Sequence, residues 1–399
     1  MKKRSVMMLQ VASGLGAMSY GTMFTIVDDL RDKYGISASH LGMVLGVGFF
    51  AGFFSNIFLA PWADRGHAKR MILIGILIQL IGNLVFGFSQ SFPLLFAARA
   101  VMGIGGGMIY PAVRRIVILT DPDNMGENLG RMLAFDVGGF TFGPVLSAIT
   151  VDALGIASPF IIISVLMAAL GLGITRIHVT EAQVEGAAPQ KLAFDLFRIR
   201  PFAGTIVIGL ALFSMIGTFD ALFSLMMKDL NAATWVANLG ISLFALPMLF
   251  LGPIGGRFTQ NFGPFKASIG GLLVGAVIMS MYGILPSPYL MMVCGVFHGV
   301  VDGLTVTGGS AAIAMVVPNE RIASAQGMQG AAQTVVAGIA SVIAGSAYGS
   351  FGRTVTFVGC AVFMLGCIAT GAWMARDHLG IKGSAGLDPI SESAVEPLL

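Results

Sequence analysis

Apolar runs of about 20 residues recur along the whole chain, and they restrict its possible folds more than any other feature. Each run is long enough to cross the hydrocarbon core of a bilayer as a helix. Only 11% of the 399 residues are charged and the mean hydropathy is +0.85, whereas about a quarter of the residues in a typical soluble domain are charged. The sequence therefore predicts a multi-pass membrane protein.

Charged residues and clusters of Pro, Gly and Asn divide the apolar sequence into twelve predicted spans. The runs are continuous rather than alternating. Helices are therefore favoured over a barrel, because a lipid-exposed backbone must satisfy its own hydrogen bonds. The predicted spans are 7–27, 40–62, 71–89, 93–115, 131–152, 156–175, 202–226, 234–255, 266–285, 288–312, 324–347 and 354–375.

The chain also divides into two similar halves. Its longest polar connection follows the sixth span, and short stretches on either side match at an offset of 200 residues, with Gly103 opposite Gly303. Such a repeat is typical of transporters built from two related bundles. We expect an all-α membrane protein with twelve transmembrane helices in two pseudo-symmetric six-helix bundles. The expected parts are a first bundle at 1–175, a cytoplasmic linker at 176–201, a second bundle at 202–375 and a disordered cytoplasmic tail at 376–399.

The distribution of Lys and Arg predicts the orientation in the membrane. Eighteen of the 23 basic residues fall on the side of the N-terminus, four fall on the other side, and Arg99 lies within a span. Basic residues concentrate on the cytoplasmic side of membrane proteins, so both termini are expected in the cytoplasm. Short loops and the lack of a large soluble domain suggest a bacterial inner membrane.

The sequence offers no pattern for an enzyme. It contains no HExxH, GxSxG or Walker motif, and the three cysteines lie inside apolar runs rather than in a metal-binding pattern. We expect no cofactor, no metal and no nucleic-acid partner. Energy for transport is therefore expected to come from an ion gradient.

Three motifs in order resemble those of the major facilitator superfamily. A loop resembling the family's G-x-x-x-D-R-x-G-R-K pattern follows the second span, an R-x-x-x-G-x-G pattern lies in the fourth, and the fifth carries the G-x-x-x-G-P pattern best known from proton-coupled antiporters. The resemblance implies the twelve-helix fold and alternating access by rocking of the two halves. The stretches are APWADRGHAKR with Asp64 and Arg65, RAVMGIGGG with Arg99, Gly103 and Gly105, and GFTFGP with Gly139, Gly143 and Pro144.

The resemblance also implies which residues act in gating. The loop after the second span is expected to form a latch that stabilises the outward-open state, and the bend in the fifth span is expected to help the halves rock. The loop departs from the family pattern at Ala60 and His67, and the copy in the second half has Gly256 where the acid would be. The latch is therefore expected mainly in the first half. The gating candidates are Asp64, Arg65, Lys69, Arg70, Gly139, Gly143 and Pro144.

Arg99 is the main candidate for substrate contact. A charge near the bilayer centre costs about 2.5 to 3.5 kcal/mol on insertion scales, so such residues usually face a cavity or a partner. In antiporters that the chain resembles, the matching arginine faces the central cavity. Tyr20 and Phe24 of the first span are expected to contact the substrate beside it. The alternative is an arginine that is structurally paired or reaches toward the membrane surface.

Four side chains are candidates for proton coupling. Asp220 in the seventh span stands opposite Tyr20 in the repeat and is expected to bind both the proton and the substrate, unless it lies nearer the outer surface. His298 and Asp302 are four residues apart on one helical face and suit a proton relay or a neutralised structural pair. Asp136 is more readily read as the structural partner of a basic residue, with proton coupling as the second interpretation.

These observations predict a secondary transporter that exports a lipophilic or amphipathic small molecule in exchange for protons. Two alternatives remain at this point: a symporter or facilitator for uptake of a sugar, organic acid or other metabolite, and a membrane receptor or assembly factor without transport. The expected partners are a small-molecule substrate, protons and the lipid bilayer, and the expected oligomeric state is a monomer.

Overall fold

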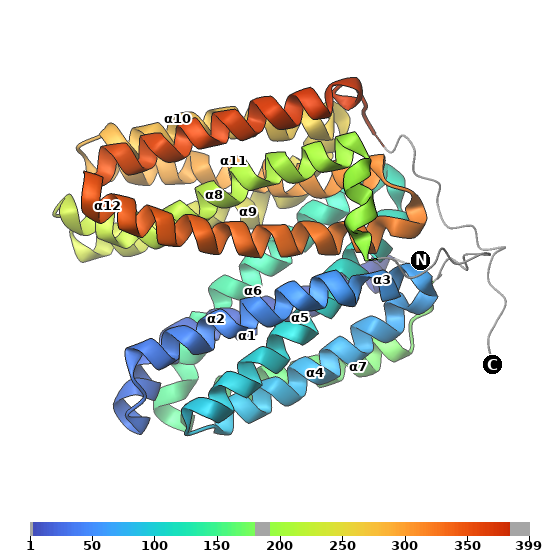
Figure 1. The fold of residues 1–399 in the computed structure, drawn as a ribbon. Helices are drawn as coiled ribbons and strands as arrows, with labels where there is room; N and C mark the ends of the chain where they lie inside the picture. Colours follow the sequence, from blue (N-terminus) through green and yellow to red (C-terminus); the bar gives the residue numbers. More distant parts are fainter. Residues whose placement is uncertain (1–2, 180–191, 384–399) are drawn as a thin grey trace.

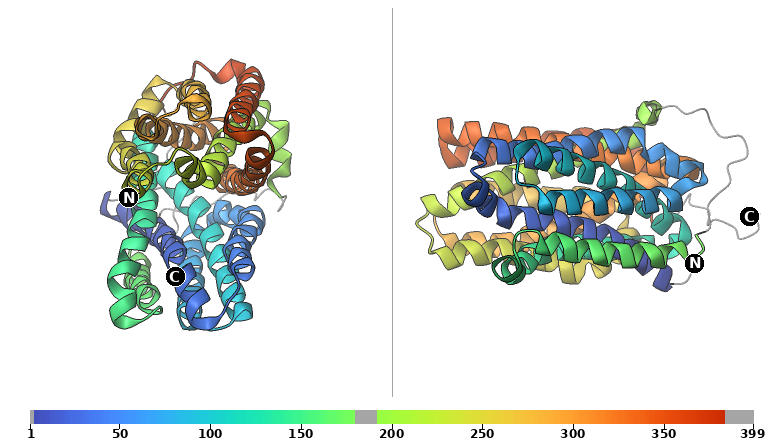
Figure 2. Two further views of the ribbon diagram at one scale, coloured as in Figure 1. Left: turned by 90° about the vertical axis from the view of Figure 1, so that its left-hand side faces the viewer. Right: turned by 90° about the horizontal axis from the view of Figure 1, so that it is seen from below.

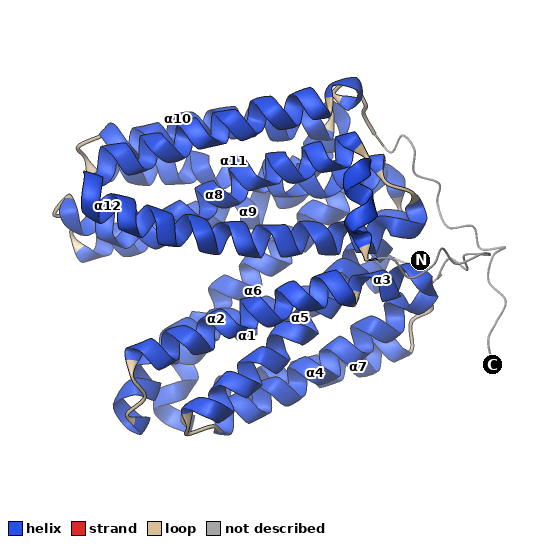
Figure 3. Ribbon diagram, viewed as in Figure 1, coloured by secondary structure: helices blue, strands red, loops and turns tan. Residues whose placement is uncertain are grey.

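The computed structural model describes residues 3–179 and 192–383, and within these ranges every regular element is helical (Figures 1 and 3). Eight helical segments of this part of the chain are long and apolar enough to cross a membrane. Two of these, His40–Phe88 and Asn319–Met374, each join two long helices, α2 (Ala38–Phe58) with α4 (Ala68–Phe88) and the two parts of α12 (Ile322–Met374). The prediction of an all-α membrane protein is confirmed.

Six long helices form the N-terminal bundle. Prolines at the first positions of α5 and α7 start those helices, because a proline there gives up an amide that has no helical partner. The Ser37 hydroxyl accepts a hydrogen bond from the His40 amide at the start of α2. The helices are α1 (Lys3–Tyr34), α2 (Ala38–Phe58), α4 (Ala68–Phe88), α5 (Phe92–Thr120), α6 (Met125–Leu154) and α7 (Ser158–Thr175), with α3 (Ala60–Trp62) and η1 (Ala63–His67) between α2 and α4.

The C-terminal bundle contains α8 to α12. The last of these is two helices joined at a sharp bend, where Gly352 has φ +79° and ψ 178°, a backbone conformation that glycine adopts without steric cost. The bend separates the two predicted spans at 324–347 and 354–375. The helices are α8 (Arg200–Asp229), α9 (Thr234–Phe262), α10 (Pro264–Ile284), α11 (Pro288–Val316) and α12 (Ile322–Met374).

The two bundles meet at one end of the molecule and diverge toward the other. The ribbons approach each other where α1 begins and α12 ends, which we call the terminal end, and they separate toward the opposite end (Figures 1 and 2). The hydrophobic core agrees with this arrangement. At the terminal end one cluster joins Met71 and Ile118 with Ile313 and Ile322 of the other bundle, whereas Met23 and Phe160 belong to a core within the N-terminal bundle.

Part of the predicted linker is folded against the C-terminal bundle. Ala193–Arg198 forms the 3-10 helix η3, with Ala193 and Leu196 buried. Asp195 accepts two hydrogen bonds from the Arg321 guanidinium, at 2.8 and 2.9 Å. The predicted disordered tail at 376–399 is described up to residue 383 and begins with the 3-10 helix η5 (Arg376–His378). The rest of the predicted linker at 180–191, and the rest of the predicted tail from 384 onward, lie outside the described residues.

Candidate functional site

Arg99 is held against aromatic rings inside the N-terminal bundle. It begins the third turn of α5 and is only 6% exposed. Its guanidinium carbon lies 4.8 Å from the centre of the Tyr20 ring and 5.8 Å from that of Phe49, an arrangement that attracts a cation to the ring faces. Gly48 leaves the space for it, because a Cβ there would overlap the guanidinium. Arg99 Nε has no hydrogen-bond partner in the described chain.

Asp220 stands opposite this arginine on the C-terminal bundle. It is exposed although it lies more than two turns from the end of α8. The charges of both Arg99 and Asp220 act on the Tyr20 hydroxyl, so the three side chains lie in one electrostatic neighbourhood between the bundles. Phe140 of α6 packs on Tyr20 with ring centres 5.8 Å apart. The side chain of Phe24 lies outside the described part of the structure.

His298 and Asp302 form a second polar group, buried in the C-terminal bundle. Both are completely buried, and His298 Nε2 lies 3.7 Å from Asp302 Oδ1, longer than a hydrogen bond. The Tyr282 hydroxyl is 3.4 Å from His298 Nδ1, and the Phe219 ring packs edge-on against the imidazole. Neither carboxylate oxygen of Asp302 has a hydrogen-bond partner among the described residues. Most buried polar groups are paired, so this carboxyl group calls for a functional explanation.

The acid of the first polar group, Asp220, and the acid of the second, Asp302, influence each other. The charge of Asp220 acts on the Asp302 carboxyl group, so α8 and α11 bring two acids into one neighbourhood within the C-terminal bundle. Within the described residues, no set of three or more His, Cys, Asp or Glu side chains is arranged to hold a metal ion. The arrangement suits binding of protons or of a charged small molecule.

Asp136 belongs to a third group, nearer the terminal end. Ser13 of α1 donates a hydrogen bond to Asp136 Oδ1, and the charges of Asp136 and Arg114 act on each other. Both side chains line a cavity of about 20 Å³, and Thr307 and Ser310 of α11 line it from the other bundle. A cavity of this size can hold about one water molecule. Such a water would connect the polar side chains of α5 and α6 with those of α11 in the other bundle.

Asp64 makes a dense set of contacts across the bundles at the terminal end. Its carboxylate accepts bonds from the amides of Ala323 and Ser324, at 2.8 and 2.7 Å, and from the Ser324 hydroxyl at 2.6 Å. These amides belong to the first turn of α12, where a helix favours a negative charge. Within its own bundle Asp64 pairs with Arg115 at 3.0 Å. Burial raises the pKa of the Asp64 carboxyl, and Arg115 and the bonds to Ala323 and Ser324 oppose that rise.

A second contact joins the bundles where α6 crosses α9. Gly126 and Gly130 pack on Gly256 and Gly252 so closely that a Cβ on any of the four would overlap the facing backbone. Gln260, one turn beyond Gly256, accepts a bond from the Gly126 amide at 2.6 Å and donates to the carbonyl oxygens of residues 122 and 123 at 2.8 and 3.1 Å. An amide side chain thus caps α6 one turn beyond Gly256, the position at which the family pattern has an acid.

The remaining predicted gating residues lie within the N-terminal bundle. Lys69 donates hydrogen bonds to the carbonyl oxygens of residues 175 and 177 at the end of α7, at 3.0 and 2.7 Å, which complements the negative end of that helix. Arg65 is half-buried and Arg70 is exposed. Gly139 and Gly143 let α6 cross α1 in backbone contact, with Pro144 as the next residue of α6.

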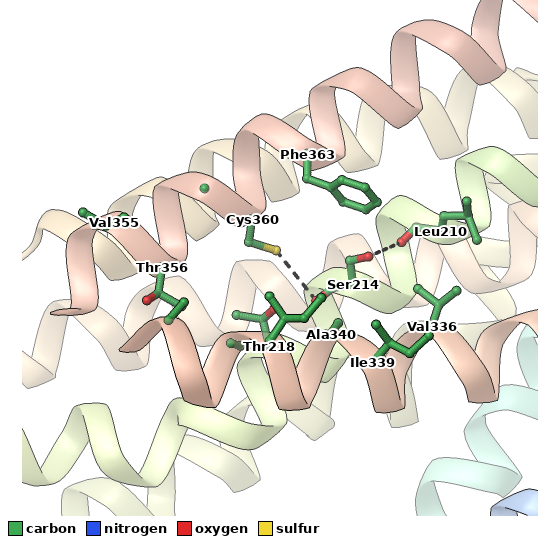
Figure 4. A pocket seen from close by; sticks show the side chains of 14 residues that line it. Leu210, Ser214, Thr218, Val336, Ile339, Ala340, Val355, Thr356, Cys360 and Phe363 are labelled. Atoms are coloured by element: carbon green, nitrogen blue, oxygen red, sulfur yellow. Dashed lines mark hydrogen bonds between the residues drawn. The ribbon is translucent and has the colours of Figure 1, made fainter. Parts of the chain in front are cut away.

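An apolar cavity of about 370 Å³ lies in the C-terminal bundle between α8 and the two parts of α12 (Figure 4). The Ser214 and Thr356 hydroxyl groups that line it donate back to their own helices. No charged side chain lines this cavity in the described chain, so it is distinct from the polar groups around Arg99 and Asp220.

Sequence reasoning missed three residues of these groups: Tyr110, Arg114 and Gln260. The Tyr110 side chain on α5 is acted on by the charges of Asp136, Arg114 and Arg99. Arg114 was counted among the basic residues of the cytoplasmic side, yet it is only partly exposed and lies beside Asp136. A helical-wheel test would have found the first two. Tyr110 and Arg114 lie about 20° and 60° around α5 from Arg99, at 3.6 residues per turn, and therefore share its face. No sequence pattern predicts the contact of Gln260.

The sequence of the chain matches a family model and several named proteins. The family model described as Major Facilitator Superfamily matches residues 7–231 and 205–396. The chain is 23% identical to the multidrug resistance protein MdtG of Serratia proteamaculans over 66% of each chain, and 24% identical to MdtG of Citrobacter koseri over 72% of this chain and 75% of that protein. It is 24% identical to the quinolone resistance protein NorA of Staphylococcus aureus over 53% of this chain and 55% of that protein.

Two solved structures share the fold. The human organic anion transporter MFSD10 superposes with a TM-score of 0.75 at 14% identity, over 92% of this chain and 99% of that one. FucP, a Major Facilitator Superfamily transporter in the outward conformation, superposes with a TM-score of 0.75 at 15% identity, over 94% and 98%.

Proposed function

Because this chain belongs to the Major Facilitator Superfamily, we propose that it is a proton-coupled exporter of lipophilic or amphipathic small molecules. It is a multi-pass membrane transporter rather than an enzyme. Membership of the family establishes a transporter; what we propose is the direction of transport (export), the coupling ion (the proton) and the substrate class (lipophilic or amphipathic molecules).

One observation carries the proposal: Asp220 and Asp302 lie on α8 and α11, two membrane-spanning helices in contact, and in the described chain only His298 lies within ion-pair distance of either acid. A carboxylate inside a membrane protein is costly unless it is paired. A proton or a cationic substrate group relieves that cost, and the two compete for the same acids. Such competition couples proton entry to substrate release.

The groups around Arg99 support an amphipathic substrate. Tyr20, Phe49 and Phe140 offer aromatic surface next to one positive and one negative side chain. A substrate with an apolar body and a polar group finds both kinds of contact there. The named functions of MdtG and NorA, multidrug and quinolone resistance, agree with this substrate class.

We further propose that both termini lie in the cytoplasm of a bacterial inner membrane and that the protein acts as a monomer. With that orientation, the contacts of Asp64 and of Gln260 close the cytoplasmic side, and the bundles diverge toward the outside. The structure then corresponds to the state that releases substrate outward and takes up protons.

Transport in proteoliposomes tests the proposal. The wild-type protein should move a fluorescent lipophilic cation against its gradient when a pH gradient is imposed. Asp220→Asn and Asp302→Asn should abolish this pH-driven accumulation while leaving substrate binding measurable. Asp152→Asn serves as a control, because Asp152 is an exposed acid near the end of α6. Full pH-driven transport by both neutral variants would refute the proposed coupling.

Arg99 supports a second candidate, transport of an organic anion. Its Nε lacks a hydrogen-bond partner in the described chain, and a guanidinium binds carboxylates well. The same proteoliposomes distinguish the two candidates. An amphipathic carboxylate moving in the direction of the proton flux, with transport lost in Arg99→Lys, would favour anion symport over export.

A further inference from the structure

An apolar groove on the C-terminal bundle lies between α9, α10 and α11. It has a volume of about 300 Å³, at the lower end of the range for small-molecule sites. Phe258, Phe262, Val274 and Phe297 form its rim and are each 48 to 60% exposed. In membrane-spanning helices such side chains face the hydrocarbon of the bilayer, so the groove opens toward lipid.

Gly270 of α10 leaves open space in the groove. An added Cβ on Gly270 would meet nothing within 4 Å. From Lys266 to Val274 the lining residues of α10 span eight positions, or about 12 Å along the helix axis. The lining therefore extends over a length suited to part of an alkyl chain.

Two lysines mark the terminal end of the groove. Lys266 lines it and is exposed in the first turn of α10. The Ile381 carbonyl oxygen packs near Gly263, and the Gly383 amide donates to the Gln260 carbonyl oxygen at 2.9 Å. Lys382, between these two contacts, is therefore held at the same end. No acidic side chain lines the groove in the described chain.

The chemistry of the groove determines its occupant. Water needs two to four polar partners to be held in a cavity, and apart from Lys266 the described lining is made of apolar side chains and glycines. An empty groove would forfeit dispersion contacts along its length. Hydrocarbon from the bilayer fills it without either cost. Lysines at the level of the lipid headgroups attract phosphate, and basic pockets between membrane helices bind anionic lipids.

We propose that this groove is a binding site for an anionic phospholipid, with one acyl chain along Gly270 and the headgroup phosphate at Lys266 and Lys382. The inference does not depend on the direction of transport or on proton coupling. α9 lines the groove and also carries Gln260, which contacts the other bundle. A bound lipid would therefore make the packing of α9 depend on the lipid composition of the leaflet at the terminal end.

Photo-crosslinking tests the site in the full chain. The protein is reconstituted in vesicles of phosphatidylethanolamine and phosphatidylglycerol that contain a phosphatidylglycerol probe with a photoactivatable acyl chain. A phosphatidylcholine probe with the same chain serves as the comparison. The wild-type protein should yield phosphatidylglycerol adducts on α10 and α11, and clearly fewer adducts with the phosphatidylcholine probe.

Matched variants separate the two parts of the site. Gly270→Phe fills the groove and should remove the adducts, whereas Gly366→Phe, at an exposed glycine of α12 whose added Cβ also meets nothing within 4 Å, should retain them. Lys266→Gln should abolish the preference for phosphatidylglycerol, and Lys266→Arg should keep it. Equal labelling by the two probes in the wild type, or adducts that persist in Gly270→Phe, would each overturn the proposal.

Discussion

The closest backbone contact between the bundles provides a direct test of how the terminal end is closed. Gly130 of α6 packs on Gly252 of α9, and a Cβ on Gly130 would overlap the Gly252 carbonyl oxygen and lie 2.5 Å from its carbonyl carbon. Ordinary contacts to a Cβ begin at 3.4 Å. We therefore expect Gly130→Ala to force the two helices apart by about 1 Å, while favouring the helical conformation of α6 itself.

A separation of this size is enough to break the cap that Gln260 makes on α6. Its bond to the Gly126 amide is 2.6 Å long and would lengthen to about 3.6 Å, beyond hydrogen-bond distance. Gln260 makes three such bonds, each with a net contribution of about 0.5 to 1.5 kcal/mol. Their combined loss, about 1.5 to 4.5 kcal/mol, shifts the equilibrium between the closed and open terminal end by about tenfold to a thousandfold.

Spin-label distances measure this shift. Labels on cysteines introduced at the exposed positions Asn124 and Asn261, with the three native cysteines replaced, report the separation of α6 and α9. Gly130→Ala should move the distance distribution to longer values. Gly138→Ala is the matched control on the same helix, because its added Cβ meets only the flexible end of Leu249, at 3.1 Å. An unchanged distribution in Gly130→Ala, or an equal shift in both variants, would refute the reasoning.

Three further substitutions have distinct expected outcomes. Asp64→Asn leaves Arg115 buried without its counter-charge, at a cost of about 3 to 5 kcal/mol, and should lower transport turnover and populate the open terminal end; unchanged turnover would contradict this. Asp302→Asn removes the charge of a buried acid whose oxygens have no hydrogen-bond partner in the described chain. It should leave the melting temperature equal or higher while pH-driven transport is lost; a large fall would indicate a structural role. Arg321→Ala breaks a partly exposed pair with Asp195 that is worth about 0 to 1 kcal/mol, so melting and transport should change little.

The membrane made the helices predictable and left their ends uncertain. Apolar runs must be helical in lipid, and each predicted span overlaps a long helix of the structure and extends beyond it by no more than a few residues at either end. The ends differ because helices continue beyond the hydrocarbon: α6 begins at Met125 rather than at 131, and α1 reaches Tyr34 rather than 27. Hydropathy predicts the part of a helix that lies in the hydrocarbon core. It does not predict the additional helical turns that extend into the polar region.

The functional residues were predictable only where a motif or an isolated charge marked them. Arg99 stood out because it is a lone charge within a span, and the structure places it on Tyr20. The position of Arg114 beside Asp136 could not be predicted from the count of basic residues. That count assigns Arg114 to one side of the membrane but does not show which face of α5 it lies on. Gln260 gave no signal, since its contact joins residues 134 positions apart and depends on how the bundles are packed.

Two of the contacts that close the terminal end differ in chemistry, and the difference predicts the order in which they open. Asp64 holds the amides of Ala323 and Ser324 with a buried charge, and its release separates that charge from the end of a helix. Gln260 holds the Gly126 amide with a neutral group, which is weaker. The crossing of α6 and α9 should therefore open first, and the Gly126 amide should exchange with solvent deuterium faster than the amides of Ala323 and Ser324. Equal exchange rates would mean that both contacts open in one cooperative step.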